Sequence, residues 1–390
     1  MGLFDDLRHS FWAALAAGLI FIACAAFARD AIAAGPSDVD AKTAQNLQLL
    51  LDQGRDDGLP GGIILRIESL RDGRTWQGTS GPFEEAREDV PIRATDSFRV
   101  ASITKSFTAA VIWRLAEDGK IGIDDRISRY LPADLVGRIH VLNGTSSGNR
   151  ITIRQLLCHC SGVYDYATDK VVLRYMFAHP EKHWTPLELI DFALRSGKPY
   201  FPPGQGQHYS DTGYLLLGLV IEHVTHEALA QVYRQFIYIP LGLHETYLEA
   251  REPAVGPPLS HNYVGYLDEH NYDPTLDAYA SGGQVSTATD LAKFIGAVMK
   301  GQFFKHPKTL QAAMAAPELP NKSAADKARY LGHYLYYSSE HDGVRLIGHE
   351  GFWGAVMLYD PDGDLVVTGT SNQVDRNLPV RQLIKAFETK

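Results

Sequence analysis

Residues 99–109 read RVASITKSFTA and connect a short apolar stretch to a segment with helical periodicity. Phe107, Val111 and Leu115 follow one another at intervals of four positions, which places them on one face of a helix. Gly119 is a natural C-terminal stop for that helix. The stretch therefore marks the point at which the chain enters a mainly helical region.

The segments on either side of this region are rich in strand signals. GGIILRIESLRDGRTWQGTSG (61–81) is typical of two strands around a turn, because alternating β-branched residues flank Arg-Asp-Gly. Near the C-terminus, residues 330–372 contain three strand-like runs with turn signals at His341–Gly343 and Asp360–Gly363. The stretch LIGHEGFWGAVMLY (346–359) is expected to be one of these strands.

Helices are predicted before, between and after these strand regions. Strands at both ends and helices between them predict an α+β fold, in which one antiparallel sheet is built from both termini. The sheet should have flanking helices and an inserted, mainly helical subdomain, with a cleft along the seam. Within a domain spanning 35–390, we expect the α/β part at about 40–100 and 275–390 and the helical part at about 101–274. The other predicted helices are Asp40–Asp52, Ile153–Leu157, Thr185–Leu194, Thr212–His223 and a terminal one within 378–390.

The first 34 residues are interpreted as an export signal. Phe11–Phe27 is apolar and uncharged, and Ala-Ile-Ala-Ala at 31–34 offers small residues to a signal peptidase. Asp5 and Asp6 leave the preceding region barely positive, and about 17 apolar residues approach the lower limit for a spanning helix. An uncleaved membrane anchor is therefore the alternative. We expect a periplasmic or secreted protein that touches a membrane only through this segment, if the segment is retained.

The composition argues against several classes of function. The 390 residues carry a formal net charge of −9 and contain no run of Lys or Arg, so nucleic acid is not an expected partner. Cys158, His159 and Cys160 spell CHC, but three adjacent residues do not easily converge on one ion. No CxxC or HExxH partner follows, so no metal site is expected. Cys158 and Cys160 are also too close in sequence for an ordinary disulfide.

Ser102 and Lys105 form the first candidate site. Residues three apart on a helix share a face, so the Lys105 ammonium should lie beside the Ser102 hydroxyl. A serine is a poor nucleophile at neutral pH, and a neighbouring lysine can take its proton or stabilise the alkoxide. The helix N-terminus adds a favourable positive potential. The plain alternative is a serine that only caps the helix, since such pairs also arise by chance.

Two further stretches carry chemically useful residues. In FPPGQGQHYSDTG (201–213), a Pro-Gly loop is followed by Tyr209 and Asp211 at the start of a helix. A tyrosine at the end of a loop can act as a base if a nearby cation lowers its pKa from about 10. The second stretch is His349–Gly351, where a glycine within a strand indicates close approach by a ligand or another backbone. Taken alone, Tyr209 could be a core tyrosine, Asp211 a helix cap and the glycine a bulge.

Together these stretches, in this order and spacing, resemble the penicillin-recognising serine hydrolases. That family contains class C β-lactamases, DD-peptidases, D-aminopeptidases and β-lactamase-like esterases. The similarity runs from about Gln45 to Phe387, and three supporting runs are GKIGIDDRISRYLP (119–132), ITIRQLLCHCSGVYDY (151–166) and ASGGQVSTATDLAKF (280–294). The resemblance implies a β-lactamase/DD-peptidase-like fold and an acyl-enzyme mechanism that needs no metal and no organic cofactor.

The resemblance also implies a role for each matching position. Ser102 would be the acylated nucleophile, Lys105 its activator, and Tyr209 the general base that then serves as acid for the leaving group. The triplet His349–Gly351 stands where many members have Lys-Thr-Gly and others have His-x-Gly. The backbone N–H groups of Ser102 and Phe352 would form the oxyanion hole.

Three positions depart from the family pattern. Asp211 replaces the asparagine usual in lactamases, so an amide donor becomes an acceptor-only carboxylate that would hold Lys105 charged. His349 replaces a lysine and lacks its permanent charge, and we expect it to titrate near pH 6.5 and to contact a substrate carboxylate when protonated. Cys160 replaces a threonine, which we interpret as a turn variation. Reading 210–212 as the Ser-Asp-Asn element of other lactamases is disfavoured by the PPGxxxxYSD context.

The sequence therefore predicts an exported serine hydrolase that acts through an acyl-enzyme on Ser102. A D-alanyl-D-alanine carboxypeptidase or D-amino-acid peptidase is favoured because the compartment holds peptidoglycan, while Asp211 and His349 argue against efficient β-lactam hydrolysis. The alternatives are a β-lactamase-like esterase and a non-catalytic, peptidoglycan-binding relative, although a silent relative has no reason to retain Ser102, Lys105 and Tyr209. The expected partner is a small-molecule or peptide substrate, either peptidoglycan-like or an ester.

Overall fold

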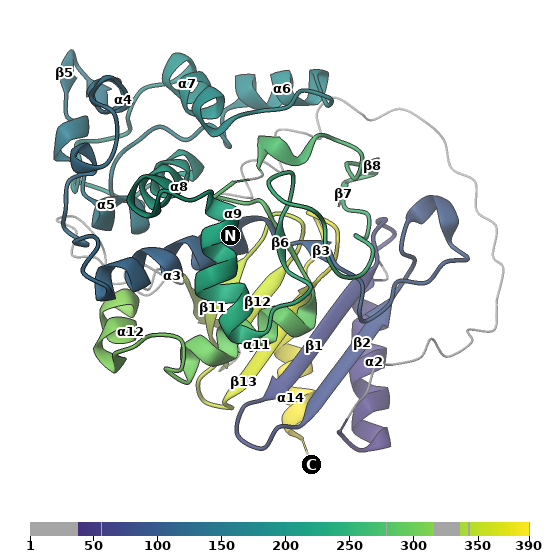
Figure 1. Ribbon diagram of the computed structural model, residues 1–390. Coiled ribbons are helices and arrows are strands. Elements are labelled where there is room, and N and C mark those ends of the chain that lie inside the picture. Colours follow the sequence, from purple (N-terminus) through teal and green to yellow (C-terminus); the bar gives the residue numbers. More distant parts are fainter. Residues whose placement is uncertain (1–37, 56, 278, 316–335, 342–343, 390) are drawn as a thin grey trace.

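The computed structural model describes residues 38–55, 57–277, 279–315, 336–341 and 344–389 (Figure 1). The N-terminal segment interpreted above as an export signal or anchor lies outside the described residues. Within the described ranges, no single helix is long and apolar enough to cross a membrane. One pair of helices, Asp211–Thr225 and Leu229–Leu241, reaches that length and composition together but is bent by 79°.

A six-stranded antiparallel sheet is built from both ends of the chain (Figure 1). Ile67 pairs with Trp76 on one side and with Val367 on the other, so the N-terminal hairpin joins the C-terminal strands through a single seam. The α+β architecture predicted from the sequence is confirmed. In spatial order the strands are β10 (Tyr336–His341), β11 (Val344–Glu350), β12 (Val356–Asp360), β13 (Leu365–Thr370), β1 (Ile63–Ser69) and β2 (Thr75–Ser80).

Each face of the sheet is covered by helices. Helix α2 (Ala41–Arg55) packs against α14 (Val380–Glu388), and their apolar residues form one core with Ile63, Leu65 and Ile67 of β1. The intervening Ile64 belongs to the second and larger core, in which α11 (Ala288–Met299) packs against β13, β12 and β1. This division follows from the alternation of side chains along a strand. The face of α14 that the periodicity predicts is buried as expected: Val380, Leu383, Ile384 and Phe387.

The middle of the chain forms the helical part. Figure 1 shows α4 to α8 gathered on the side of the molecule away from α2 and α14. Helix α3 is buried along most of its length and contacts α8 and α9, so any polar group that it carries is enclosed by apolar side chains. The helices are α3 (Thr104–Glu117), α4 (Ala133–Ile139), α5 (Ile153–Leu157), α6 (Lys170–Ala178), α7 (Pro186–Ser196), α8 (Asp211–Thr225), α9 (Leu229–Tyr233), α10 (Ile239–Leu241) and α12 (Pro307–Met314).

A small three-stranded sheet connects the two parts. Strand β3 (Phe98–Arg99) pairs with β9 (Gln284–Ser286), which pairs in turn with β6 (Tyr247–Leu248). These strands are two or three residues long, so they carry no readable alternation, and the sequence analysis missed them. Their position matters because β3 ends immediately before the turn that holds Ser102.

The predicted strand 346–359 is wrong: this stretch is a hairpin. The chain leaves the sheet at Gly351, whose N–H donates to Ala355 O at 2.8 Å, and it returns with β12 at Val356. Residues 330–372 therefore contribute four strands rather than three within the described positions. A Cβ added to Gly351 would lie 2.2 Å from Val100 O, so the expected close approach of another backbone is confirmed.

Candidate active site

Ser102 lies on a tight turn between β3 and α3. The turn Ala101–Ile103 runs directly into the helix, and Ile103 rather than Ser102 is the N-cap residue, so the capping alternative is wrong. Ala101 has φ 45°, a left-handed conformation that costs about 1–3 kcal/mol in a residue other than glycine. Ala101 and Ile103 are fully buried, whereas Ser102 is half-buried and keeps access to solvent.

Lys105 is buried and donates hydrogen bonds in three directions. Its Nζ lies 3.0 Å from Ser102 Oγ, 2.6 Å from Asp211 Oδ1 and 2.6 Å from Ser281 O. The side chain is only 1% exposed. An ammonium group has three N–H donors, and each has an acceptor here. The structure therefore brings Ser102 and Lys105 together as their spacing predicts, with Lys105 in its charged form.

The start of α8 supplies the third and fourth predicted residues. Ser210 is the N-cap of this helix, which leaves the carboxylate of Asp211 free to face Lys105. Tyr209, in the loop just before, is hydrogen-bonded to Ser102. The Lys105 ammonium also lies 4.8 Å from the centre of the Tyr209 ring. Residues about one hundred positions apart in the sequence thus meet around one hydroxyl.

The condition under which Tyr209 could act as a base, a pKa lowered by a nearby cation, is not met in the free protein. Burial, followed by the negative charge of Asp211, raises its pKa well above the ordinary value, although the hydrogen bond with Ser102 opposes this. Burial is the larger cause, and the Lys105 ammonium does not offset it because its charge is paired with the Asp211 carboxylate at 2.6 Å. Tyr209 is therefore a neutral phenol in the free protein.

Two more carboxyl groups surround this ion pair, and the sequence analysis missed both. Asp165 is fully buried, and its Oδ1 accepts the N–H of Asp211 at 2.8 Å. Burial and then the charge of Asp211 raise the pKa of Asp165 to about 7, and the same causes raise the pKa of the half-buried Asp277 to about 7. Asp165 lies in a run that resembles the family, but its sequence context does not distinguish it from a surface aspartate.

His159 lies beneath the tyrosine. Its ring stacks on that of Tyr209 with the centres 4.4 Å apart, and its Nδ1 accepts the N–H of Ser210 at 3.1 Å. Burial, followed by the charge of Lys105, lowers the pKa of His159 well below its usual value, so the imidazole is neutral and can accept this hydrogen bond. In the sequence, His159 stands out only as part of the CHC motif within the family-like run 151–166.

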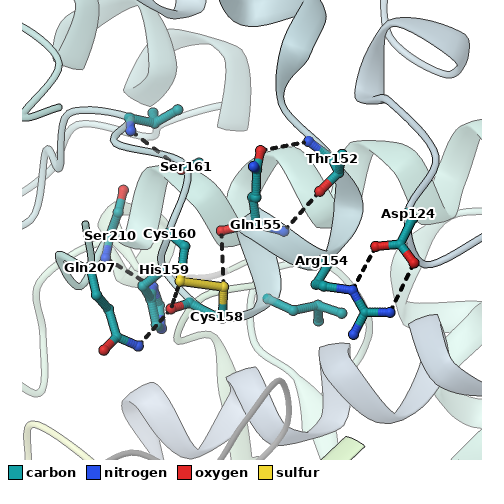
Figure 2. The surroundings of a disulfide bond; sticks show 12 residues. Asp124, Thr152, Arg154, Gln155, Cys158, His159, Cys160, Ser161, Gln207 and Ser210 are labelled. Carbon is teal, nitrogen blue, oxygen red and sulfur yellow. Dashed lines mark hydrogen bonds and ion pairs between the residues drawn. A yellow bond between two sulfur atoms is a disulfide. The ribbon is translucent and has the colours of Figure 1, made fainter. Parts of the chain in front are cut away.

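Cys158 and Cys160 are joined by a disulfide bond (Figure 2). The expectation that they are too close in sequence for this is wrong. His159 between them has φ 57°, and the resulting tight turn places the two Cα atoms 5.3 Å apart, within the range usual for disulfides. The replacement of a threonine by Cys160 is therefore more than a turn variation.

Strand β11 contacts the turn Ala101–Ile103 that holds Ser102. His349 is 5% exposed, and its Nδ1 lies 2.7 Å from Glu350 O. Burial, followed by the charge of Lys105, lowers the pKa of His349 to about 3, so the expectation that it titrates near pH 6.5 is wrong for the free protein. The Phe352 N–H makes no hydrogen bond to the described residues, which leaves it available to a substrate oxygen.

A half-exposed serine on a strained turn, in contact with a buried lysine and a tyrosine, is the geometry of an activated nucleophile. Residues 51–386 match the Beta-lactamase protein family. The chain belongs to this family. It is accordingly a serine hydrolase with the beta-lactamase fold.

Proteins of known sequence or structure support the assignment. Penicillin-binding protein 4* of Bacillus subtilis (strain 168) is 29% identical over 328 residues, which cover 78% of this chain and 67% of that protein. A D-stereospecific amidohydrolase from Streptomyces sp. is 28% identical with a TM-score of 0.74, over 89% of this chain and 98% of that one. The D-amino acid amidase from Ochrobactrum anthropi SV3, complexed with L-phenylalanine amide, is 25% identical with a TM-score of 0.74, over 89% and 99%.

Proposed function

We propose that this beta-lactamase-family enzyme hydrolyses amides or peptides of D-amino acids through an acyl-enzyme on Ser102. The observation that carries the proposal is the 3.0 Å contact between Lys105 Nζ and the half-exposed Ser102 Oγ. The names of the two similar solved structures support the amide class, since both describe enzymes that act on D-amino acid derivatives or amides. The D-alanyl-D-alanine carboxypeptidase favoured by the sequence is one form of this activity. Export remains part of the proposal, on the basis of Phe11–Phe27.

Lys105 needs a proton acceptor before it can activate Ser102. An ammonium that already donates to Ser102 Oγ cannot take the proton of that hydroxyl. Asp211, at 2.6 Å, can receive one proton from Lys105 while Lys105 receives the proton of Ser102. The net change is a serine alkoxide and a protonated Asp211, and Lys105 is again an ammonium beside the alkoxide. Relatives with asparagine at this position lack such an acceptor.

Tyr209 suits the second proton transfer. An amine is a poor leaving group unless it is protonated, and a neutral phenol beside Ser102 is a donor in the right place. The resulting phenolate would be stabilised by the Lys105 ammonium, 4.8 Å from the ring centre. The backbone N–H groups of Ser102 and Phe352 would bind the oxyanion, as the family resemblance implies.

The substrate class is tested with purified full-length protein. The panel contains D- and L-phenylalanine amide, a D-Ala-D-Ala peptide, p-nitrophenyl acetate and nitrocefin, with S102A as the control. We expect turnover of the D-amide in preference to the L-amide, slow turnover of nitrocefin, and a mass increase confined to Ser102. Ester turnover without amide turnover would identify the esterase alternative. Absence of any adduct with every compound would identify a non-catalytic relative.

A further inference from the structure

The CHC turn holds the loop that carries Tyr209. Each of its three residues accepts a hydrogen bond from that loop, and three of the four donors lie within two residues of Tyr209. Figure 2 shows two of these contacts beside the disulfide. The contacts are Gly204 N–H to Cys160 O (2.8 Å), Gln207 Nε2 to Cys158 O (2.7 Å), His208 N–H to His159 O (2.9 Å) and Ser210 N–H to His159 Nδ1 (3.1 Å).

The conformation of His159 depends on its two neighbours. At φ 57° it occupies a left-handed region that residues other than glycine adopt only when the surrounding structure enforces it. The disulfide between Cys158 and Cys160 closes a ring through the backbone of His159, so it restricts the rotations that would release this conformation. The same conformation stacks the imidazole on Tyr209 and places it, in a tilted arrangement, 5.2 Å from the centre of the Tyr214 ring.

We infer that His159, fixed by the Cys158–Cys160 disulfide, is a positioning residue for Tyr209, so that opening the disulfide lowers the rate of the chemical step. The inference rests on the proposed function, in which Tyr209 transfers a proton at Ser102. The disulfide does not touch the substrate, and it acts through the imidazole and the loop contacts described above. The β11 side of the site also takes part in substrate binding. We therefore expect KM to change much less than kcat.

Opening the disulfide requires a reductant that supplies two electrons. Dithiothreitol supplies two electrons and two protons, Cys158 and Cys160 become thiols, and the reagent closes to its own cyclic disulfide. Both cysteines are almost fully buried, at 3% and 2% exposed, so the reaction should be slow and should need local opening of the turn. The backbone hydrogen bonds of the turn remain after reduction, so the loss of activity should be partial. We expect kcat to fall about tenfold, which corresponds to the strain of one residue in an unfavourable backbone conformation.

The test uses the full chain in a C24S background, so that only Cys158 and Cys160 can be titrated. The untreated protein should show no free thiol, and incubation with dithiothreitol should continue until two thiols per chain react. We expect kcat for D-phenylalanine amide to fall about tenfold with KM within about twofold, and to recover on reoxidation. C158S/C160S should have the kcat of the reduced enzyme and should not respond to dithiothreitol. Free thiols in the untreated protein, or an unchanged kcat after reduction, would overturn the inference.

The same experiment in a Y209F background distinguishes an effect on the position of the Tyr209 hydroxyl from a general loss of order in the protein. If the disulfide acts through the Tyr209 hydroxyl, reduction should not lower the remaining kcat of Y209F. An equal loss in both backgrounds would mean that the disulfide serves the fold alone. A readout independent of catalysis is the ring-current shift of the His159 imidazole in selectively labelled protein, which should change on reduction. If Ser102 is never acylated, the proposed function fails while this shift still decides the positioning claim: a change supports it and no change overturns it.

Discussion

The Lys105 ammonium and the Asp211 carboxylate form an ion pair 2.6 Å long with side chains 1% and 9% exposed. Asp211 thereby neutralises the cation on which the tyrosine of the family pattern would depend, and Tyr209 keeps its proton. One departure from the usual asparagine thus changes which group can accept a proton at Ser102.

Removing Asp211 should destabilise the protein strongly. D211A leaves the buried charge of Lys105 without its partner, and breaking a buried pair in this way costs about 3–5 kcal/mol of unfolding free energy. D211N keeps an oxygen that accepts from Lys105 and should cost less. Urea unfolding at pH 7 measures both variants. Equal stability of D211A and the wild type would show that Lys105 sheds its proton or finds another acceptor.

Ser102 should be dispensable for folding and essential for turnover. It is half-buried and caps no helix, so S102A should change the free energy of unfolding by less than about 1 kcal/mol. Turnover of every substrate should be abolished because the bond to the acyl group forms at its hydroxyl. Hydrolysis of a nitrophenyl ester by S102A at the wild-type rate would place the activity elsewhere.

The elements with a long apolar period could be predicted from the sequence. Helices α3 and α14 and the hairpin of β1 and β2 agree with prediction because each buries a regular set of side chains over several turns or alternations. The hairpin at Gly351 could not be predicted, because β11 and β12 lie in one largely apolar run of the sequence and the close approach of Val100 to Gly351 is a tertiary contact. Short β3 and β9 are paired by tertiary contacts alone.

The residues of the site could be predicted from the sequence, but their protonation states could not. Ser102, Lys105 and Tyr209 were predicted from local motifs, and these can be recognised in the sequence without knowledge of the fold. The pKa values of Tyr209 and His349 depend on burial and on the charges of Asp211 and Lys105, which are distant in sequence. Asp165 has no local signal at all, since only its burial beside Asp211 distinguishes it.

Asp165 should make the protein less stable as the pH rises toward neutrality. Its pKa is about 7 in the folded protein and near 3.8 in the unfolded chain, so between these values the folded state binds more protons. The free energy of unfolding should therefore fall from about pH 4 to pH 7. D165N keeps the oxygen that accepts the Asp211 N–H and should make this decline shallower, with Asp277 responsible for the part that remains. An identical pH profile for D165N would show that Asp165 ionises at its ordinary pKa.

Tyr209→Phe should affect amides more than activated esters. A neutral Tyr209 acts as the proton donor to the departing amine, and loss of such a donor lowers kcat by about 10²–10⁴-fold. A nitrophenolate leaves without a proton, so kcat for p-nitrophenyl acetate should fall much less. The comparison uses kcat for D-phenylalanine amide and for the ester with the same preparation. An equal loss for both substrates would instead make Tyr209 the base that activates Ser102.

His349 should not respond to pH near neutrality. Its pKa of about 3 means that the imidazole carries no charge between pH 6 and 8, so a substrate carboxylate gains nothing from it in that range. KM for a D-Ala-D-Ala peptide should therefore be flat across these pH values, as should KM for a neutral D-amino-acid amide.

His349→Lys introduces a cation at the position where many relatives have lysine, and it should lower KM for the anionic peptide while leaving that of the amide nearly unchanged. If KM for the peptide rises through about pH 6.5 in the wild type but not in His349→Lys, the bound carboxylate raises the pKa of His349 enough to charge it. That outcome would favour the carboxypeptidase form of the proposed activity over the amidase form.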